Sequence, residues 1–190
     1  QALNGIGKSL SEKILDILDT GTCQIYEKLK DFKDPKEVFL KIPEVGPVKA
    51  KEIVDNGFTT IEELREVQDE FLNNKQKIGL KYYEDSQLRI PRKEVKSHST
   101  YLTSILNNVD PEAEGMVTGS FRRKTQTSGD IDFLIMSPKN NKKVFNKFID
   151  RLYSEGYLED HLARGPSKDM GFGSFEGKPM RRIDILYCKS

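Results

Sequence analysis

Apolar residues recur every three or four positions in parts of this chain, and short apolar runs appear in its second half. The helical spacing covers 10–18, 93–109 and 144–153, and the short runs lie at 116–117, 133–136 and 183–187. The spacing predicts helices and the runs predict buried strands, with one more strand and a turn in the glycine-rich range 165–179. From residue 116 onward the predicted order is strand, strand, helix, strand, strand, which indicates a mixed sheet covered by helices. The predicted fold class is therefore α+β.

An internal repeat with an offset of 39 residues occupies the helical half. The offset pairs Leu3 with Ile42, Ile6 with Val45 and Gly7 with Gly46. A glycine permits a tight turn with positive φ, and a helix that starts behind it offers free amide groups to a phosphate. We therefore expect two turns that bind a DNA backbone without reading bases. The predicted DNA-binding residues are Gly5, Gly7, Lys8, Val45, Gly46, Lys49 and Lys51.

Three aspartates accompany two of the predicted strands. Asp130 and Asp132 are two residues apart, so in a strand they point to the same face, and Asp184 belongs to a later strand. Carboxylates beside the polar turn Gly119-Ser120 can hold Mg²⁺ against nucleotide phosphates. A single Asp-x-Asp is usually a solvated strand end, but three aspartates on two strands that could pair favour a metal site.

These residues carry a specific resemblance. Gly119-Ser120 followed by Gly129-Asp130-Ile131-Asp132 is similar to the nucleotidyltransferase signature of the polymerase-beta superfamily. Within this superfamily, the runs 119–123 and 181–185 resemble those of the family X DNA polymerases, and most of all the beta type. The resemblance extends over residues 3–186. It implies a helical helix-hairpin-helix region followed by a nucleotidyltransferase palm with a mixed β-sheet. The implied domains are 1–28, the end of a lyase-like domain with the first hairpin; 29–88, a duplex-DNA-binding helical subdomain with the second; and 89–190, the catalytic palm.

The resemblance also implies a role for each site residue. Asp130, Asp132 and Asp184 would be catalytic and hold two Mg²⁺ or Mn²⁺ ions, and Arg182 would support Asp184 and the primer end. The implied nucleotide-binding residues are Gly119, Ser120, Arg123, Gly129 and Arg89. The backbones of Leu3, Ile6, Leu40, Ile42 and Val45 would hold Na⁺ or K⁺. Lys13 matches the Schiff-base lysine of a 5′-deoxyribose phosphate lyase, although Ser9 replaces a phosphate-binding lysine of the family.

The function that the resemblance implies is a DNA-directed DNA polymerase that fills short gaps in base excision repair. It would transfer a nucleotide from dNTP to a primer 3′-hydroxyl, act on gapped or nicked duplex DNA, and work as a monomer. Two alternatives stay open: a template-independent nucleotidyltransferase on the same palm, and a non-catalytic DNA-structure-binding module. The double hairpin disfavours the first alternative, and three intact aspartates disfavour the second.

Bulk properties limit the partners and the compartment. The net charge is +1, so DNA binding must use local basic patches. No apolar run approaches the roughly 20 residues of a membrane span, and we expect no membrane partner. Cys23 and Cys188 are far apart, which indicates unpaired thiols in a reducing compartment. We expect an intracellular protein, nuclear or virus-associated, that is not secreted. The chain begins at Gln1 and ends soon after Asp184, so we expect a part of a longer polymerase, cut before the thumb and weak or inactive alone.

Overall fold

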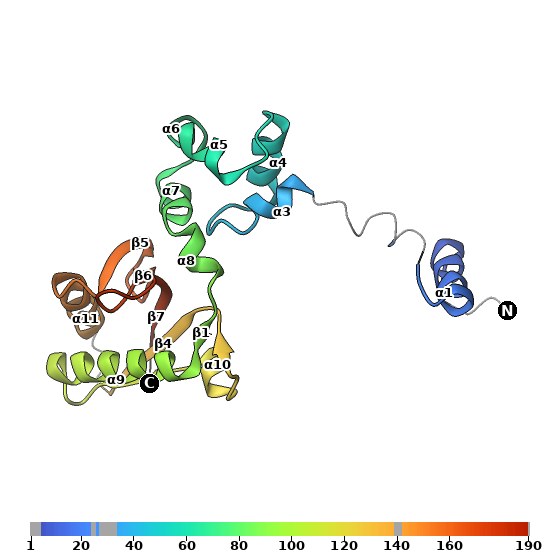
Figure 1. Ribbon diagram of the computed structural model, residues 1–190. Coiled ribbons are helices and arrows are strands. Elements are labelled where there is room, and N and C mark those ends of the chain that lie inside the picture. Colours follow the sequence, from blue (N-terminus) through green and yellow to red (C-terminus); the bar gives the residue numbers. More distant parts are fainter. Residues whose placement is uncertain (1–4, 24–25, 27–33, 139–141, 190) are drawn as a thin grey trace.

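The computed structural model describes residues 5–23, 26, 34–138 and 142–189 and confirms the α+β class (Figure 1). The described helices are α1 (Lys8–Thr20), α3 (Pro35–Phe39), α4 (Pro47–Asp55), α5 (Ile61–Glu66), α6 (Gln68–Phe71), α7 (Asn74–Lys81), α8 (Tyr83–Gln87), α9 (Arg92–Val109), α10 (Gly119–Arg122) and α11 (Lys142–Ser154). The strands are β1 (Ile90–Pro91), β2 (Glu114–Val117), β3 (Thr127–Ser128), β4 (Ile131–Ser137), β5 (Leu158–Arg164), β6 (Lys168–Gly173) and β7 (Arg181–Lys189).

The main sheet of the C-terminal half has the strand order β2-β4-β7-β6-β5. Only β4 and β7 run parallel, and their neighbours are antiparallel, so the sheet is mixed as predicted. Every second residue of β4 is buried, which is the period-2 pattern of a strand with one face on a core. A separate two-stranded pair, β1 with β3, lies beside the sheet.

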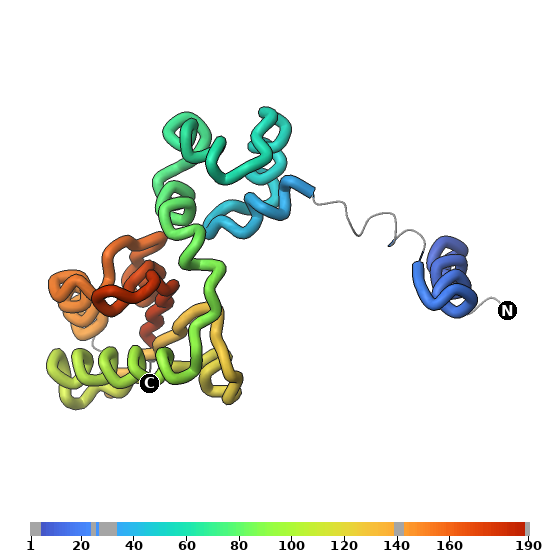
Figure 2. The backbone as a smooth tube through the Cα atoms, in the orientation of Figure 1, coloured from blue at the N-terminus to red at the C-terminus, as the bar shows by residue number. Residues whose placement is uncertain are grey.

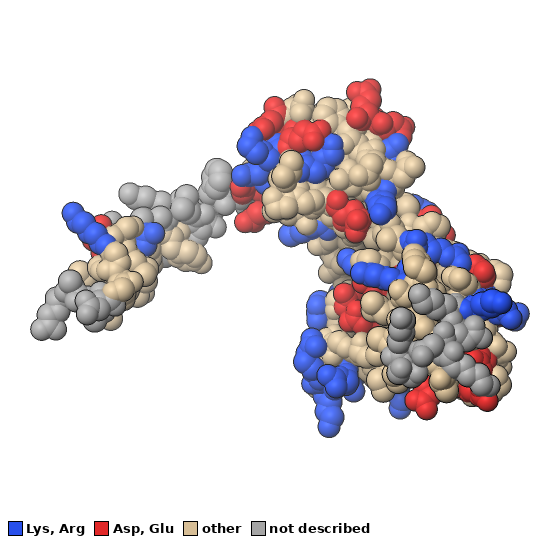
Figure 3. All heavy atoms as spheres, turned by 180° about the vertical axis from the view of Figure 1, so that it is seen from behind, with Lys and Arg blue, Asp and Glu red and all other residues tan. Residues whose placement is uncertain are grey.

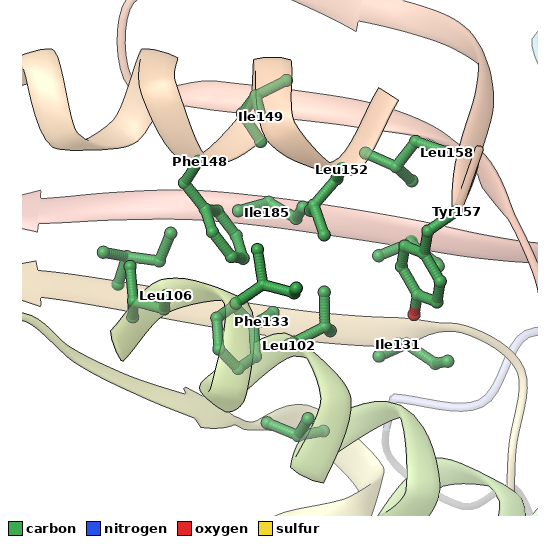
Figure 4. Packing of buried hydrophobic residues seen from close by; sticks show 14 of the residues in the cluster. Leu102, Leu106, Ile131, Phe133, Phe148, Ile149, Leu152, Tyr157, Leu158 and Ile185 are labelled. Atoms are coloured by element: carbon green, nitrogen blue, oxygen red, sulfur yellow. The ribbon is translucent and has the colours of Figure 1, made fainter. Parts of the chain in front are cut away.

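Helices α9 and α11 cover one face of this sheet. Phe148 and Leu152 of α11 and Leu102 of α9 point toward Phe133 of β4 and Ile185 of β7 (Figure 4). All five side chains are fully buried. Burial of each large apolar side chain stabilises the fold by about 1.5–3 kcal/mol. This core fixes β4 and β7, the two strands that carry the candidate aspartates.

A second, all-helical core is built by residues 38–83. Phe39, Ile42, Ile53, Leu64 and Leu80 are buried there. Two helices of this unit start with capping boxes, in which the side chains of the N-cap and N3 residues bind each other's backbone amides. Thr60 is the N-cap residue of the first of these capping boxes, at the start of α5.

Helix α1 stands apart from the two packed units (Figure 2). It ends at Thr20, and the next residue, Gly21, adopts the left-handed conformation of a helix C-cap. None of its residues is buried, and Leu15 and Leu18 are exposed. Among the described residues, we find no helix with the length and apolarity needed to cross a bilayer.

Two expectations about helices and strands were wrong. Strand β5 was not predicted, because its register against β6 shifts twice and its polar residues break the period-2 alternation. The Gly119-Ser120 segment forms the short helix α10 rather than a simple turn. The domain boundaries at residues 28 and 88 remain predictions.

Candidate active site

Asp132 and Asp184 lie directly opposite each other in the parallel pair of β4 and β7. Asp130 precedes β4 by one residue, so all three predicted aspartates lie where these two strands begin. Asp184 is buried, whereas Asp130 and Asp132 are half-buried. The parallel register therefore brings together residues that are more than 50 positions apart in the sequence.

The aspartates repel one another electrostatically. Burial raises the pKa of Asp132, the charges of Asp130 and Asp184 raise it further, and Arg182 and Arg123 oppose the rise. A carboxylate cluster with a raised pKa is a common property of a site that works with a cation. Hard oxygen donors of this kind fit Mg²⁺ or Mn²⁺.

Arg182 binds Asp184 at two points. Its Nε donates to Oδ1 at 3.2 Å and its Nη2 donates to Oδ2 at 3.1 Å. Each of the two carboxylate oxygens of Asp184 thus accepts a hydrogen bond from the same guanidinium. In this arrangement, no three His, Cys, Asp or Glu side chains in the described parts of the chain converge closely enough for one metal ion.

Gly119 leaves room for the Asp132 carboxylate. A Cβ at this position would lie 2.2 Å from Asp132 Oδ2, and the φ of Gly119 is +55°. The Thr118 amide also donates to the Asp132 carbonyl at 2.8 Å. This hydrogen bond joins the start of α10 to β4. Position 119 requires a glycine because its φ is positive and because a side chain would collide with the Asp132 carboxylate.

The predicted nucleotide-binding residues surround the next turn. Ser120 Oγ donates to Ser128 Oγ at 2.8 Å. Ser128 belongs to β3, and Arg89 binds the other residue of this strand. Its Nε donates to Thr127 Oγ1 at 3.2 Å and its Nη2 donates to the Thr127 carbonyl at 3.0 Å. A Cβ on Gly129 would lie 3.1 Å from Arg89 Nη1. Ser120, Gly129 and Arg89 therefore converge on β3.

Basic side chains gather at the edge of the sheet domain formed by α10, where Lys and Arg cluster in Figure 3. Arg122, Arg123 and Lys124 are all exposed there. Arg92 was not among the predicted site residues. Its Nη1 donates to the Phe121 carbonyl at 2.8 Å, and its guanidinium lies over the Phe121 ring. The sequence feature that could have indicated Arg92 is its position directly after Pro91, at the start of a predicted helix and three residues from Arg89.

A cleft of about 370 Å³ separates the carboxylates from the helical unit. Its walls come from the turn 40–45, from the α8 end, and from Asp130, Arg181 and Arg182. Charged side chains of both signs thus face the space beside the aspartates.

Comparison with known proteins decides the family. Residues 89–190 match the family described as "DNA polymerase beta palm", and residues 37–87 match "Fingers domain of DNA polymerase lambda". The palm match covers more than half of the chain and contains all three aspartates. The chain belongs to the family X DNA polymerases.

Two curated relatives are both named DNA polymerase lambda. The protein from Arabidopsis thaliana is 31% identical over 179 residues, which cover 90% of this chain and 33% of the relative. The protein from Rattus norvegicus is 30% identical over 194 residues, which cover 97% of this chain and 34% of the relative. The chain thus spans about a third of the length of these family X polymerases.

The two copies of the internal repeat share their backbone geometry. Gly5 has φ +88° and Glu44 has φ +68°, and these positions are 39 residues apart. Gly7 and Gly46 are extended and cap α1 and α4. We expected positive φ at these later glycines, and this was wrong, because the left-handed residue stands two positions earlier. In the second copy that residue is a glutamate.

The remaining predicted residues lie on or beside these turns. Lys49 pairs with Glu52 at 2.8 Å, Lys51 pairs with Asp55, and Lys8 lies 4.0 Å from Glu12. The Ile42 carbonyl accepts the Val45 amide at 3.1 Å. Lys13 is exposed on α1. Leu3 lies outside the described residues, and the cation sites at the turns remain predictions.

Proposed function

We propose that this chain supplies the palm and the DNA-binding helical region of a repair polymerase that fills short gaps. The observation that carries the proposal is the pairing of Asp132 with Asp184 beside Asp130, on two strands of a family X palm. Because the chain spans about a third of its relatives, the activity belongs to the proposal for the whole protein.

The three aspartates would hold two divalent ions. When bound, Mg²⁺ or Mn²⁺ would neutralise charge on the phosphates and lower the barrier to attack by the primer 3′-hydroxyl. The donor set supports this, since the three carboxylates lie on adjacent strands, and burial together with the charges of Asp130 and Asp184 raises the pKa of Asp132.

The protein's own groups would position the reactants. Asp184 Oδ would accept, or help to remove, the proton of the primer 3′-hydroxyl, while Arg182 steadies its carboxylate and the primer end. Ser120, the Gly129 amide, Arg89 and Arg123 would bind the triphosphate. Arginine suits this role because its guanidinium is always charged and binds phosphate oxygens in pairs.

The repeated turns would hold the DNA backbone. Free amides behind Gly7 and Gly46, with Lys8, Lys49 and Lys51, would contact phosphates without base specificity. Backbone carbonyls around Ile6 and Val45 would coordinate Na⁺ or K⁺. Lys13, which is exposed on α1, would be the Schiff-base lysine if the whole protein has lyase activity.

The test is insertion of one nucleotide into a one-nucleotide DNA gap. We expect Mg²⁺-dependent insertion by the full-length protein and a loss of at least about a thousandfold in Asp132→Ala, because several kcal/mol of charge stabilisation disappear. Asp19→Ala, an exposed carboxylate of α1, is the matched control and should keep its activity. The 190-residue chain is assayed alongside.

Two other results would replace the proposal. DNA binding without insertion by the full-length protein would favour the non-catalytic binding module. Insertion at ends that lack a template would favour the template-independent nucleotidyltransferase.

A further inference from the structure

Arg92, the first residue of α9, is bound to α10 and to the turn that follows it. Its Nη1 donates to the Phe121 carbonyl at 2.8 Å and, over a longer distance of 3.4 Å, to the Thr125 carbonyl. Its Cζ lies 4.2 Å from the centroid of the Phe121 ring, and its backbone amide donates to the Gln126 carbonyl at 3.0 Å. One half-buried side chain therefore binds both ends of the segment 121–125.

The segment 121–125 has little structure of its own. Helix α10 is only four residues long, and a helix of one turn is marginal without tertiary contacts. Phe121 packs against the core of the sheet domain, but the residues after it are exposed. Lys124 also adopts a left-handed conformation with φ +63°, which is unfavourable for a residue with a side chain. The segment therefore depends on contacts from outside it, and Arg92 supplies two of them.

Two of the proposed triphosphate ligands are connected to this segment. Arg123 lies inside it, and Ser120 comes directly before it. The Ser120 carbonyl accepts the Thr125 amide at 3.3 Å and the Thr125 hydroxyl at 3.1 Å. Thr125 is thus bound by Arg92 through its own carbonyl and binds Ser120 through its amide and hydroxyl.

We propose that Arg92 is a positioning residue for the incoming nucleotide: it clamps the segment 121–125 so that Ser120 and Arg123 meet the triphosphate. The inference rests on the proposed function. Arg92 acts through these two residues, since its guanidinium is bound to carbonyls and to an aromatic ring of the protein. The clamp matters because a small displacement of a binding group weakens its interaction with a reactant steeply.

The first measurement is insertion of one nucleotide into gapped DNA by the full-length protein, with the KM for the dNTP and kcat determined separately. Arg92→Met should raise this KM at least about fivefold and keep kcat within about threefold, because triphosphate binding is weakened in the ground state and the transition state alike. Arg92→Lys should recover part of the loss, since an ammonium group can still bind one carbonyl. In an Arg123→Met background, Arg92→Met should add much less, because one group that it positions is absent.

The second measurement does not depend on activity. Trypsin cleaves after lysine and arginine, so Arg122, Arg123 and Lys124 are cleavage sites inside the clamped segment. Arg92→Met should speed cleavage after these residues in the 190-residue chain at least about fivefold, because local opening exposes the backbone to the protease. Mass spectrometry of the fragments assigns each cleavage to its position.

Arg65→Met is the matched control. Arg65 also donates to a backbone carbonyl, that of Leu80, at 3.3 Å, but it lies in the helical unit. Its loss should change neither the KM for the dNTP nor the rate of cleavage within 122–124.

Four results would overturn the inference. An unchanged KM in Arg92→Met would do so and leave the proposed function standing. A raised KM without faster cleavage would show that Arg92 does not clamp the segment. Equal effects of Arg92→Met with and without Arg123→Met would show that Arg92 does not act through Arg123. Absence of insertion by the unchanged full-length protein would remove the proposed function itself, and the inference with it.

Discussion

Asp132 and Asp184 are register partners on adjacent parallel strands, although 51 residues lie between them in the sequence. Each strand is fixed by the same apolar core beneath α9 and α11. The fold thus holds two carboxylates side by side at a cost in electrostatic repulsion.

Asp132→Asn should stabilise the metal-free protein while it weakens metal binding. Because the pKa of Asp132 is raised in the folded state, its ionised carboxylate lowers the free energy of unfolding near pH 7. Asparagine has a similar shape and removes that charge. We expect a small rise in melting temperature without metal and at least a tenfold loss of Mn²⁺ affinity. Differential scanning calorimetry and a Mn²⁺ titration measure both. A variant that is destabilised and still binds Mn²⁺ normally would contradict the electrostatic description of the cluster.

Gly119→Ala should damage the site more than its backbone strain explains. Alanine at this position would meet Asp132 Oδ2 at 2.2 Å and adopt φ +55°. Gly177 is the matched control, because its φ is +71° but no atom lies within 4 Å of an added Cβ. Both variants should lose about 1–2 kcal/mol of stability from the left-handed conformation. Only Gly119→Ala should also lose Mn²⁺ affinity, and equal affinity in the two variants would refute the contact.

Glu44→Gly should stabilise the helical unit and strengthen DNA binding. Glu44 is a non-glycine residue with φ +68°, so glycine relieves about 1 kcal/mol of strain, net of its own entropy cost. It also removes a negative charge from the turn proposed to bind phosphates. Lys124→Gly relieves the same kind of strain, at φ +63°, but removes a positive charge from α10. Fluorescence anisotropy with duplex DNA should show tighter binding for Glu44→Gly and weaker binding for Lys124→Gly.

Asp169 should give stability a specific pH dependence. Its side chain is fully buried in β6, and burial raises its pKa from 3.8 to about 6, although the nearby Arg164 and His161 oppose the rise. Because the folded pKa exceeds the unfolded one, the folded state favours the proton, and stability is lost as pH rises through the window from about 4 to about 6.

Asp169→Asn removes this loss. Two pKa units correspond to about 3 kcal/mol, so the variant should exceed the unchanged protein by up to this amount at pH 8 and match it below pH 4. Urea unfolding at several pH values measures the difference. Asp160 is a control of opposite sign, since Lys81 and Tyr82 bind its carboxylate and lower its pKa against the effect of burial. Asp160→Asn should therefore destabilise the protein above pH 4.

The sequence predicts much of this fold because local pattern and packing agree in most elements. The apolar stripes of α9 and α11 and the run of β4 each bury the face that their spacing indicates. Strand β5 escaped prediction because bulges break its alternation. The positive φ of Glu44 could not be read from residue type, since glutamate rarely adopts it. Its place was nevertheless implied by the repeat, which aligns it with Gly5.

The site was predictable in its residues but not in its contacts. Spacing and resemblance indicated Asp130, Asp132 and Asp184, whereas the register that opposes two of them depends on strand pairing. The contacts of Glu94 and Arg92 also depend on distant partners, Arg181 and the Phe121 carbonyl. Contacts of this kind cross the tertiary structure, and no local pattern encodes them.

The most direct test of the central claim is the position of Mn²⁺ in crystals grown with MnCl₂ and a dNTP, located by anomalous diffraction. We expect two peaks about 3.5–4 Å apart among Asp130, Asp132 and Asp184, with the triphosphate beside Ser120. Well-ordered aspartates without any Mn²⁺ peak between them, or peaks only elsewhere on the protein, would contradict it.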